Sequence, residues 1–323
     1  MSAAHVVNLA EVMSMHPRRV VDRHPKPEPE VTLLDESAGF LGLGRSLTFP
    51  WPQWRANDEY RTVFFDEGRG RTLVFIHGLG ANGTHWERIA TSLVDRYRVV
   101  APDLVGCGWS RKPHVTYSVD LLRDHLIAFL ESRGIRHAVL AGHSMGGAVC
   151  LAAALKRPDL VEALVLVSAA GVGPLPRWMR AVGPSALRRS VLLPFFVLGA
   201  SFILDNVFVA RPEENEHVRW FRESAMRDDK GMPNLLDFAR VCETLCTDLL
   251  HRDYSPQFHR IHVPVLALWG DADRLTYVPS VLRSLDGFPR LRTVVLRRCG
   301  HMPMVERPDE TLFHLERFLS SPP

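Results

Sequence analysis

Cysteines are few in this chain, and their arrangement argues against two kinds of protein. Five occur among 323 residues, scattered and without C-x-x-C spacing: Cys107, Cys150, Cys242, Cys246 and Cys299. An odd, scattered set is not the framework of a disulfide-rich secreted domain, and it lacks the paired spacing of a zinc site. We therefore expect a protein of a reducing compartment, with a cytoplasmic localisation and no metal.

Long apolar runs are also missing. Residues 1–15 contain no basic region followed by an apolar core, so they do not have the pattern of a secretion signal. The longest apolar tract, residues 191–204, has 14 residues and includes Pro194, whereas a membrane-spanning helix needs about 20. We expect no integral membrane segment.

Strong charge of either sign is the third absence. The net charge is +3, and no run of Lys or Arg is long enough to indicate a nucleic acid or an anionic membrane as partner. Hydrophobic residues make up 46% of the chain and charged residues 23%, as in an ordinary globular protein. The length suits one α/β domain of about 250 residues with an insertion, or two small domains.

From Tyr60 onward the sequence contains a regular alternation of strand-like and helix-like segments. Short apolar, β-prone runs predict strands at residues 60–65, 71–76, 98–101, 137–141, 163–167, 263–269 and 291–296. Helix-favouring segments, with helical spacing or an alanine-rich composition, are residues 86–96, 117–133, 145–155 and 309–319. Repeated β-α units of this kind predict a parallel sheet covered by helices.

The alternation is interrupted between residues 171 and 262, a gap that is too long for a loop. This stretch carries prolines among helical pieces and predicts a helical cap inserted between consecutive strands. The core then consists of residues 59–170 and 263–323. Residues 1–58 are expected to form an N-terminal extension, partly mobile, because residues 24–30 alternate proline with charge.

A serine stands between a predicted strand and a predicted helix. Residues 142–146 read Gly-His-Ser-Met-Gly, directly after the strand at 137–141. A serine on so sharp a turn needs a strained backbone, and a side chain at Gly142 or Gly146 would collide with the adjoining strand and helix. Because the strand, turn and helix are the context that a nucleophilic serine of this kind requires, we predict Ser144 as the nucleophile.

A glycine-rich turn, His77-Gly78-Leu79-Gly80, follows the predicted strand 71–76. Loops after parallel strands build the sites of such sheets. We expect the backbone N–H of Leu79 to pair with that of Met145 as an oxyanion hole, at about 3 kcal/mol per donor. The alternative is an ordinary glycine turn.

Carboxylates and an imidazole follow two later strands. Asp271 and Asp273 come after the strand 263–269, and His301 comes after the strand 291–296. Each alone has an ordinary explanation, as a surface acid or a satisfied histidine. Three matches, each just after a strand and in the chain order Ser, Asp, His, indicate a hydrolase triad instead.

Residues 60–320 resemble the α/β-hydrolase fold superfamily, in particular its capped branch of esterases, lipases and carbon-carbon bond hydrolases. The resemblance is carried by HGLG at 77–80, APDLVGCGWS at 101–110, GHSMGG at 142–147, WGDAD at 269–273 and GHMPMVERP at 300–308. It implies an α/β-hydrolase fold, with a mostly parallel sheet flanked by helices and an inserted helical cap. It implies no metal and no organic cofactor.

The resemblance also implies roles for single residues. Asp273 stands in the W-G-x-x-D register, whereas Asp271 is better placed to stabilise the turn. Epoxide hydrolases and haloalkane dehalogenases of the superfamily carry Asp at the position of Ser144, so those chemistries are disfavoured. The implied site is Ser144 as nucleophile, His301 as base, Asp273 as the acid that orients it, and Leu79 and Met145 as oxyanion donors. His77 and His143 are expected to be positional.

The leading functional hypothesis is hydrolysis of a carboxylic ester of a small or medium, largely apolar substrate through an acyl-enzyme. Alternatives with the same residues are hydrolysis of a carbon-carbon bond in a vinylogous diketone, acyl transfer to an alcohol or thiol, and ligand binding with slow turnover. The apolar stretch 191–209 must be buried against the core, against a second copy or a membrane surface, or over an acyl pocket. We expect a small-molecule partner and no nucleic acid, and a homo-oligomer stays open.

Overall fold

The computed structural model describes residues 31–33, 45–49, 60–191, 207–209, 215–216, 218–219, 235–276 and 278–320. The apolar stretch 191–209 therefore lies outside the described residues, except for Val191 and residues 207–209. No helix in the described ranges is long and apolar enough to cross a membrane. All five cysteines fall within these ranges and are free thiols.

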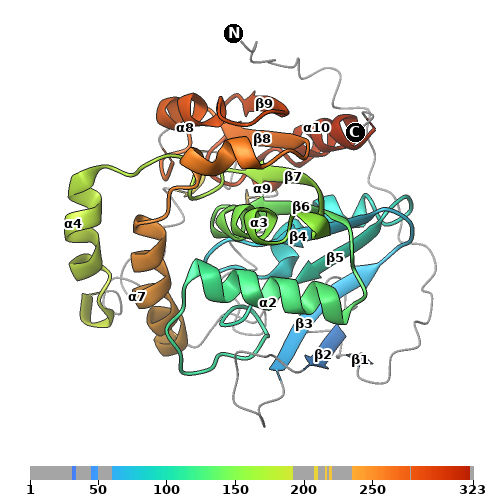
Figure 1. The fold of residues 1–323 in the computed structure, drawn as a ribbon, viewed down its shortest axis with the longest axis horizontal. Coiled ribbons are helices and arrows are strands. Elements are labelled where there is room, and N and C mark those ends of the chain that lie inside the picture. The colour runs from blue at the N-terminus through green and yellow to red at the C-terminus, as the bar shows by residue number, and fades with distance from the viewer. Residues whose placement is uncertain are drawn as a thin grey trace.

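The described strands form one sheet of nine, in the order β1-β2-β3-β5-β4-β6-β7-β8-β9 (Figure 1). Neighbours from β5 to β9 are parallel, whereas β1, β2 and β3 add antiparallel strands at one edge. The expected mostly parallel sheet is confirmed. The strands are β1 (Val31–Leu33), β2 (Arg45–Phe49), β3 (Tyr60–Glu67), β4 (Thr72–Ile76), β5 (Arg98–Pro102), β6 (Ala138–His143), β7 (Val161–Val167), β8 (Val265–Gly270) and β9 (Leu291–Leu296).

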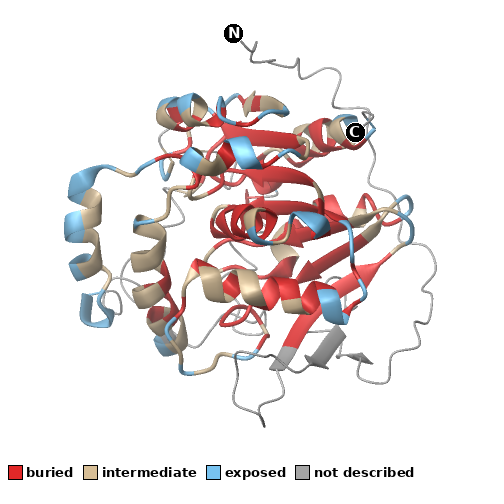
Figure 2. Ribbon diagram, in the orientation of Figure 1, coloured by how far each residue is buried: buried red, intermediate tan, exposed pale blue. Residues whose placement is uncertain are grey.

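Helices cover both faces of this sheet, and alternate residues of each strand supply two apolar cores (Figure 2). In β4, Val74 and Ile76 belong to one core, and Leu73 and Phe75 belong to the other. Burial on both faces explains why the strands read as unbroken apolar runs. The first core is covered by α2 (Val119–Ser132), α3 (Met145–Lys156) and α8 (Val278–Leu285), and the second by α1 (Glu87–Thr91), α9 (Pro303–Glu306) and α10 (Pro308–Leu319). Short 3₁₀ helices are η3 (Gly83–Trp86), η4 (Pro158–Leu160) and η6 (Ser255–Arg260).

Most predicted elements are present, with ends shifted by a few residues. The strand predicted at 291–296 is β9 with the same bounds, and the helix predicted at 309–319 is α10. The helix predicted at 86–96 is shorter, because α1 ends at Thr91 and turns follow. β1 and β2 come from residues 1–58, which we assigned to an extension; strands of three and five residues are too short to show an alternating pattern.

Two α-helices with described bounds belong to the stretch predicted as a cap, which also contains η6. α4 (Arg177–Ala186) and α7 (Leu235–Leu250) pack together at one side of the molecule, on the left in Figure 1. α4 follows the carboxyl end of β7, and α7 precedes β8, so both helices lie between consecutive strands of the sheet. The assignment of the whole stretch 171–262 to a cap stays a prediction.

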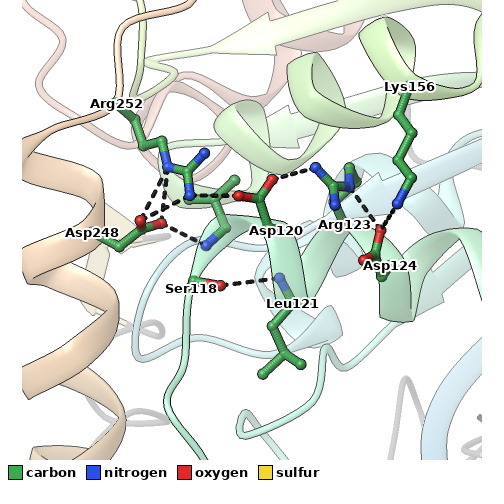
Figure 3. Close-up of polar contacts among 9 residues, drawn as sticks. Ser118, Asp120, Leu121, Arg123, Asp124, Lys156, Asp248 and Arg252 are labelled. Carbon is green, nitrogen blue, oxygen red and sulfur yellow. Dashed lines mark hydrogen bonds and ion pairs between the residues drawn. The ribbon is translucent and has the colours of Figure 1, made fainter. Parts of the chain in front are cut away.

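Hydrogen bonds and ion pairs fix α7 to the core (Figure 3). Asp248 accepts a hydrogen bond from the backbone N–H of Val119 at 2.8 Å, in the first turn of α2. Arg252 joins Asp248 to Asp120 of α2, with distances of 2.8 and 2.7 Å. Because a helix N-terminus has unpaired N–H groups and partial positive charge, the Asp248 carboxylate stabilises the start of α2 while it anchors α7. The polar network continues along α2 and α3 through Arg123, Asp124 and Lys156.

Three histidines are held in the neutral form: His77 and His125 are buried, and His85 is half-buried with its Nδ1 shielded from solvent. The backbone N–H of Val105 donates to Nδ1 of His125 at 3.3 Å, so its Nε2 carries the proton and faces the Thr62 hydroxyl at 2.7 Å. Burial lowers the pKa of His125 to about 3, that of His85 to about 3 and that of His77 to about 4. Folding removes water from around these side chains, and this desolvation disfavours the charged form of the ring.

These pKa values predict that the fold loses stability as the pH falls. Between pH 6.5 and about 4 the unfolded chain takes up protons on the three histidines and the fold does not, so the free energy of unfolding rises with pH. The slope is about 1.4 kcal/mol per pH unit for each histidine. Urea unfolding at several pH values measures it.

Two variants test whether the pH dependence of the free energy of unfolding comes from the buried histidines. His125→Gln should reduce the slope by about 1.4 kcal/mol per pH unit, the contribution of one proton. The same change at the exposed His137 should leave the slope as in the wild type. Equal free energies of unfolding at about pH 7 and about pH 5 would contradict the buried, neutral state of these rings.

Candidate active site

Ser144 lies at the junction of β6 and α3, in a backbone conformation that is rare for a residue with a side chain. Its φ is 51° and its ψ is −117°. Its N–H donates to the carbonyl of Val167 at 3.0 Å, and its carbonyl accepts from the N–H of Ala170 at 2.9 Å. The neighbours His143 and Met145 are buried, but Ser144 is partly exposed. The surrounding structure holds a strained residue with its side chain accessible, as the sequence predicted.

Two glycines leave the room that this turn needs. A Cβ atom on Gly142 would lie 2.4 Å from the carbonyl oxygen of Gly146. A Cβ atom on Gly146 would lie 2.4 and 2.6 Å from the carbonyl oxygens of Ile76 and His77. These atoms are backbone and cannot move aside cheaply, so any larger residue at either position must displace the end of β4 or the start of α3.

The loop after β4 lies directly against Ser144. A Cβ atom on Gly78 would lie 3.4 Å from Cβ of Ser144 and 2.8 Å from Nδ1 of His143. His77 holds this loop, because its Nδ1 donates to the carbonyl of Gly78 at 2.8 Å and its Nε2 accepts from the N–H of Leu104 at 3.0 Å. Both nitrogens of the His77 ring are hydrogen-bonded to backbone and hold the loop in place, the positional role that the sequence suggested for this residue.

Two backbone N–H groups beside Ser144 are available for a ligand. Met145 is the first residue of α3, where helical hydrogen bonding leaves the N–H without an acceptor. Among the hydrogen bonds within the described parts of the chain, none has the N–H of Leu79 or of Met145 as its donor. Leu79 belongs to the loop that lies against the Ser144 turn. Its role as an oxyanion donor, together with Met145, stays a prediction.

His301 and Asp273 are joined across two neighbouring strand ends. Nδ1 of His301 donates to Oδ2 of Asp273 at 2.9 Å, and both residues are buried. A Cβ atom on Gly270 would lie 2.2 and 2.3 Å from the carbonyl oxygens of Cys299 and Gly300, so this glycine allows the two loops to approach. Nδ1 carries the proton in this arrangement, which leaves Nε2 of His301 as a hydrogen-bond acceptor.

The carboxylate of Asp273 is held in its ionised form. Its Oδ1 accepts from the N–H groups of Leu275 and Thr276 at 2.8 and 3.1 Å, and its Oδ2 also accepts from the Thr276 hydroxyl at 2.5 Å. Burial alone would raise the pKa, but hydrogen bonding and charge from His301, with the Thr276 donors, lower it to about 2. Asp271 is exposed and accepts from the N–H of Cys299 at 3.3 Å. His301 is therefore hydrogen-bonded to Asp273 and not to Asp271.

His143 and Glu306 position the backbone around His301. Nε2 of His143 donates to the carbonyl of His301 at 2.9 Å, and the two rings lie 4.9 Å apart. Burial, followed by the charge of His301, lowers the pKa of His143 well below 6.5 and keeps it neutral. The buried Glu306 accepts from the N–H groups of Gly300 and Val209 at 2.8 and 2.9 Å. The sequence analysis missed Glu306, although an acidic residue inside the apolar motif at 300–308 was a signal for it.

The structure does not complete every predicted contact. Within the described residues the Ser144 hydroxyl makes no hydrogen bond, so the predicted nucleophile and the predicted base, His301, are not joined. Such bonds are often long in ligand-free proteins and tighten when a substrate binds. No group of three or more His, Cys, Asp or Glu side chains in the described ranges is arranged to hold a metal ion.

Comparisons with known proteins agree with this fold. The model of a family described as alpha/beta hydrolase fold matches residues 71–308. The chain is 28% identical to a 2-hydroxymuconate semialdehyde hydrolase from a Pseudomonas strain, covering 80% of this chain and 88% of that one. It is 29% identical to Lipase 1 of Psychrobacter immobilis, covering 80% and 81%. It also resembles a crystal structure of a bacterial membrane phospholipase A, with 31% identity, a TM-score of 0.67 and 85% of each chain covered.

The contacts of the Ser144 turn predict that Gly146→Ala costs more stability than a change of backbone preference can explain. Its added Cβ meets two backbone oxygens, and overpacking of this kind costs about 3 kcal/mol or more. Gly134→Ala is the matched control, because Gly134 has a φ of +64° but nothing within 4 Å, so only strain of about 1 kcal/mol remains. Urea unfolding compares the two. Equal costs would contradict the close packing.

Proposed function

The chain belongs to the alpha/beta hydrolase fold family, and we propose that it is a serine hydrolase that cleaves carboxylic esters through an acyl-enzyme. The observation that carries the proposal is the strained, partly exposed Ser144 at the carboxyl end of β6, in a sheet whose strands β8 and β9 are followed by the hydrogen-bonded pair Asp273 and His301. A nucleophile, a base, an orienting acid and an oxyanion hole are the parts that acyl transfer needs.

The reaction would proceed in two halves. Oγ of Ser144 attacks the ester carbonyl while Nε2 of His301 takes its proton, and the carbonyl oxygen gains negative charge. The N–H groups of Leu79 and Met145 donate to that oxygen. The C–O bond then breaks, and His301 gives its proton to the departing alcohol. Water repeats the sequence on the acyl-enzyme and releases the acid. Asp273 keeps His301 in the correct tautomer throughout.

An apolar acyl group of small or medium size suits the surroundings of this site. A Cβ atom on Gly80 would lie 2.9 Å from two ring carbons of Phe238, so this side chain of α7 lies against the loop that carries Leu79. Because hydrogen bonds anchor α7 to α2, this ring is held beside the loop and could contact an acyl chain bound there. The relatives named as a lipase and a phospholipase support an ester with an acyl chain.

Hydrolysis of a carbon-carbon bond is the second candidate. The relative named 2-hydroxymuconate semialdehyde hydrolase favours it. The same nucleophile and base would serve, but the leaving group is then a carbon atom that must receive the proton. Turnover of simple esters would favour ester hydrolysis over carbon-carbon bond hydrolysis.

We expect Ser144→Ala and His301→Ala each to reduce the hydrolysis of 4-nitrophenyl esters by about 10³-fold or more, because triad members act as a unit. A series of esters from acetate to octanoate measures kcat/KM, and a fluorophosphonate probe followed by peptide mass spectrometry locates the reactive serine. Ser132→Ala, at an exposed serine that ends α2, is the control and should keep both activities.

Three results would separate the alternatives. Ser144→Ala that keeps more than a few per cent of the turnover would rule out the mechanism. Labelling of Ser144 without turnover of any ester would favour carbon-carbon bond hydrolysis. A fall of kcat/KM from acetate onward would show that the pocket is small or polar.

Asp273→Asn should lower kcat by about 10⁴-fold, because an amide that donates to Nδ1 fixes the wrong tautomer of His301. Asp271→Asn is the matched control, since the same change is made two residues earlier at an exposed side chain. We expect its kcat to stay within about threefold of the wild type. The assignment of the acid is wrong if the two variants exchange these results.

A further inference from the structure

α4 is the outermost described helix of the molecule, and none of its residues is buried (Figures 1 and 2). Trp178 is 69% exposed and Val182 is 60% exposed. The two stand four residues apart and therefore lie on the same side of the helix. Ala181, Ser185 and Ala186 are exposed as well, so this side presents two large apolar side chains among small ones. Large exposed side chains of this kind mark a surface that meets another apolar phase.

The opposite side of α4 is fixed to the rest of the protein. A Cβ atom on Gly183 would lie 2.3 Å from Cδ1 of Leu250, so the backbone of α4 approaches α7 closely there. Arg189, just after α4, pairs with Glu243 of α7 at 2.9 Å. Because α7 is itself anchored to α2, the apolar side of α4 is held facing outward.

The charge around this apolar side is positive. Arg177 begins α4 and Arg188 follows its last residues, and both are exposed. No Asp or Glu occurs in the sequence between Glu162 and Asp205. A tryptophan and a valine flanked by arginines form the pattern of a helix that lies in a lipid-water interface.

We propose that the exposed face of α4 docks on an anionic lipid bilayer. Trp178 and Val182 enter the boundary between headgroups and acyl chains, while Arg177 and Arg188 contact lipid phosphates. The face fits a second copy of the chain poorly, because a two-fold interface through α4 would bring like-charged arginines together. The overall charge of +3 gave no sign of such a partner; the structure places Arg177 at the start of one exposed helix and Arg188 just after its end.

Vesicle binding tests the proposal separately from catalysis. Full-length Ser144→Ala protein, which we expect not to hydrolyse lipid, is sedimented with vesicles of phosphatidylcholine alone or with about 30% phosphatidylglycerol. We expect binding to the anionic vesicles, weakened by salt because it depends on charge. In this background, Trp178→Ser/Val182→Ser should reduce binding about tenfold or more. Arg177→Gln/Arg188→Gln should also reduce binding to the anionic vesicles, by about fivefold for each arginine that is replaced.

The control removes the same charge elsewhere. Arg136 and Arg260 are exposed and precede β6 and β8, at the opposite end of these strands from the site. Arg136→Gln/Arg260→Gln should bind as the parent does, and thermal unfolding checks that every variant is folded. The proposal is overturned by equal binding to both kinds of vesicle, by equal loss in the control, or by no binding to the anionic vesicles. A dimer that Trp178→Ser dissociates would then assign the face to a second copy of the chain.

Discussion

The close approach of backbone at the carboxyl end of the parallel strands is the constraint on which the rest of the structure depends. Gly142 and Gly146 let α3 start against the end of β4, and this forces Ser144 into a positive φ with its side chain exposed. The same contact places the loop of Leu79 beside the serine. Gly270 brings the end of β8 against the loop of His301 in a similar way. In each case a hydrogen atom in place of a side chain allows two loops to meet, so the candidate site is a consequence of packing.

Around these contacts, four buried side chains make hydrogen bonds that hold the backbone or the reacting groups: Asp273, His77, His143 and Glu306. Asp273 has four hydrogen-bond donors, from the backbone and side chain of two neighbouring residues and from His301, and its pKa falls to about 2 despite burial. His77 and His143 are neutral rings that hold backbone carbonyls, and Glu306 holds the loop of His301. Such pairing removes the cost of burying polar atoms and fixes the orientation of the reacting groups before substrate arrives. It also makes the fold sensitive to acid.

The sequence was sufficient for the core because its strands are apolar on both faces and its motifs directly follow them. The turn at Ser144 and the pairing of His301 with Asp273 could be predicted from glycine, serine and histidine at those points. Partners set by three-dimensional approach could not, such as Glu306 with Val209 or Asp248 with Val119, because nothing in the chain links residues so far apart. β1 and β2 were missed because they are short. The arginines around the exposed face of α4 were missed because they are few and do not form a run in the sequence.

The central claim is that the turn at Ser144, the loop at Leu79 and the pair His301–Asp273 form one acyl-transfer site. A crystal structure of the protein after reaction with a fluorophosphonate tests it most directly. We predict phosphorus bonded to Oγ of Ser144, with one phosphonyl oxygen within about 3.1 Å of the N–H groups of Leu79 and Met145, and Nε2 of His301 facing the adduct. Phosphorus on another residue, or a phosphonyl oxygen farther than about 3.5 Å from both N–H groups, would contradict the account.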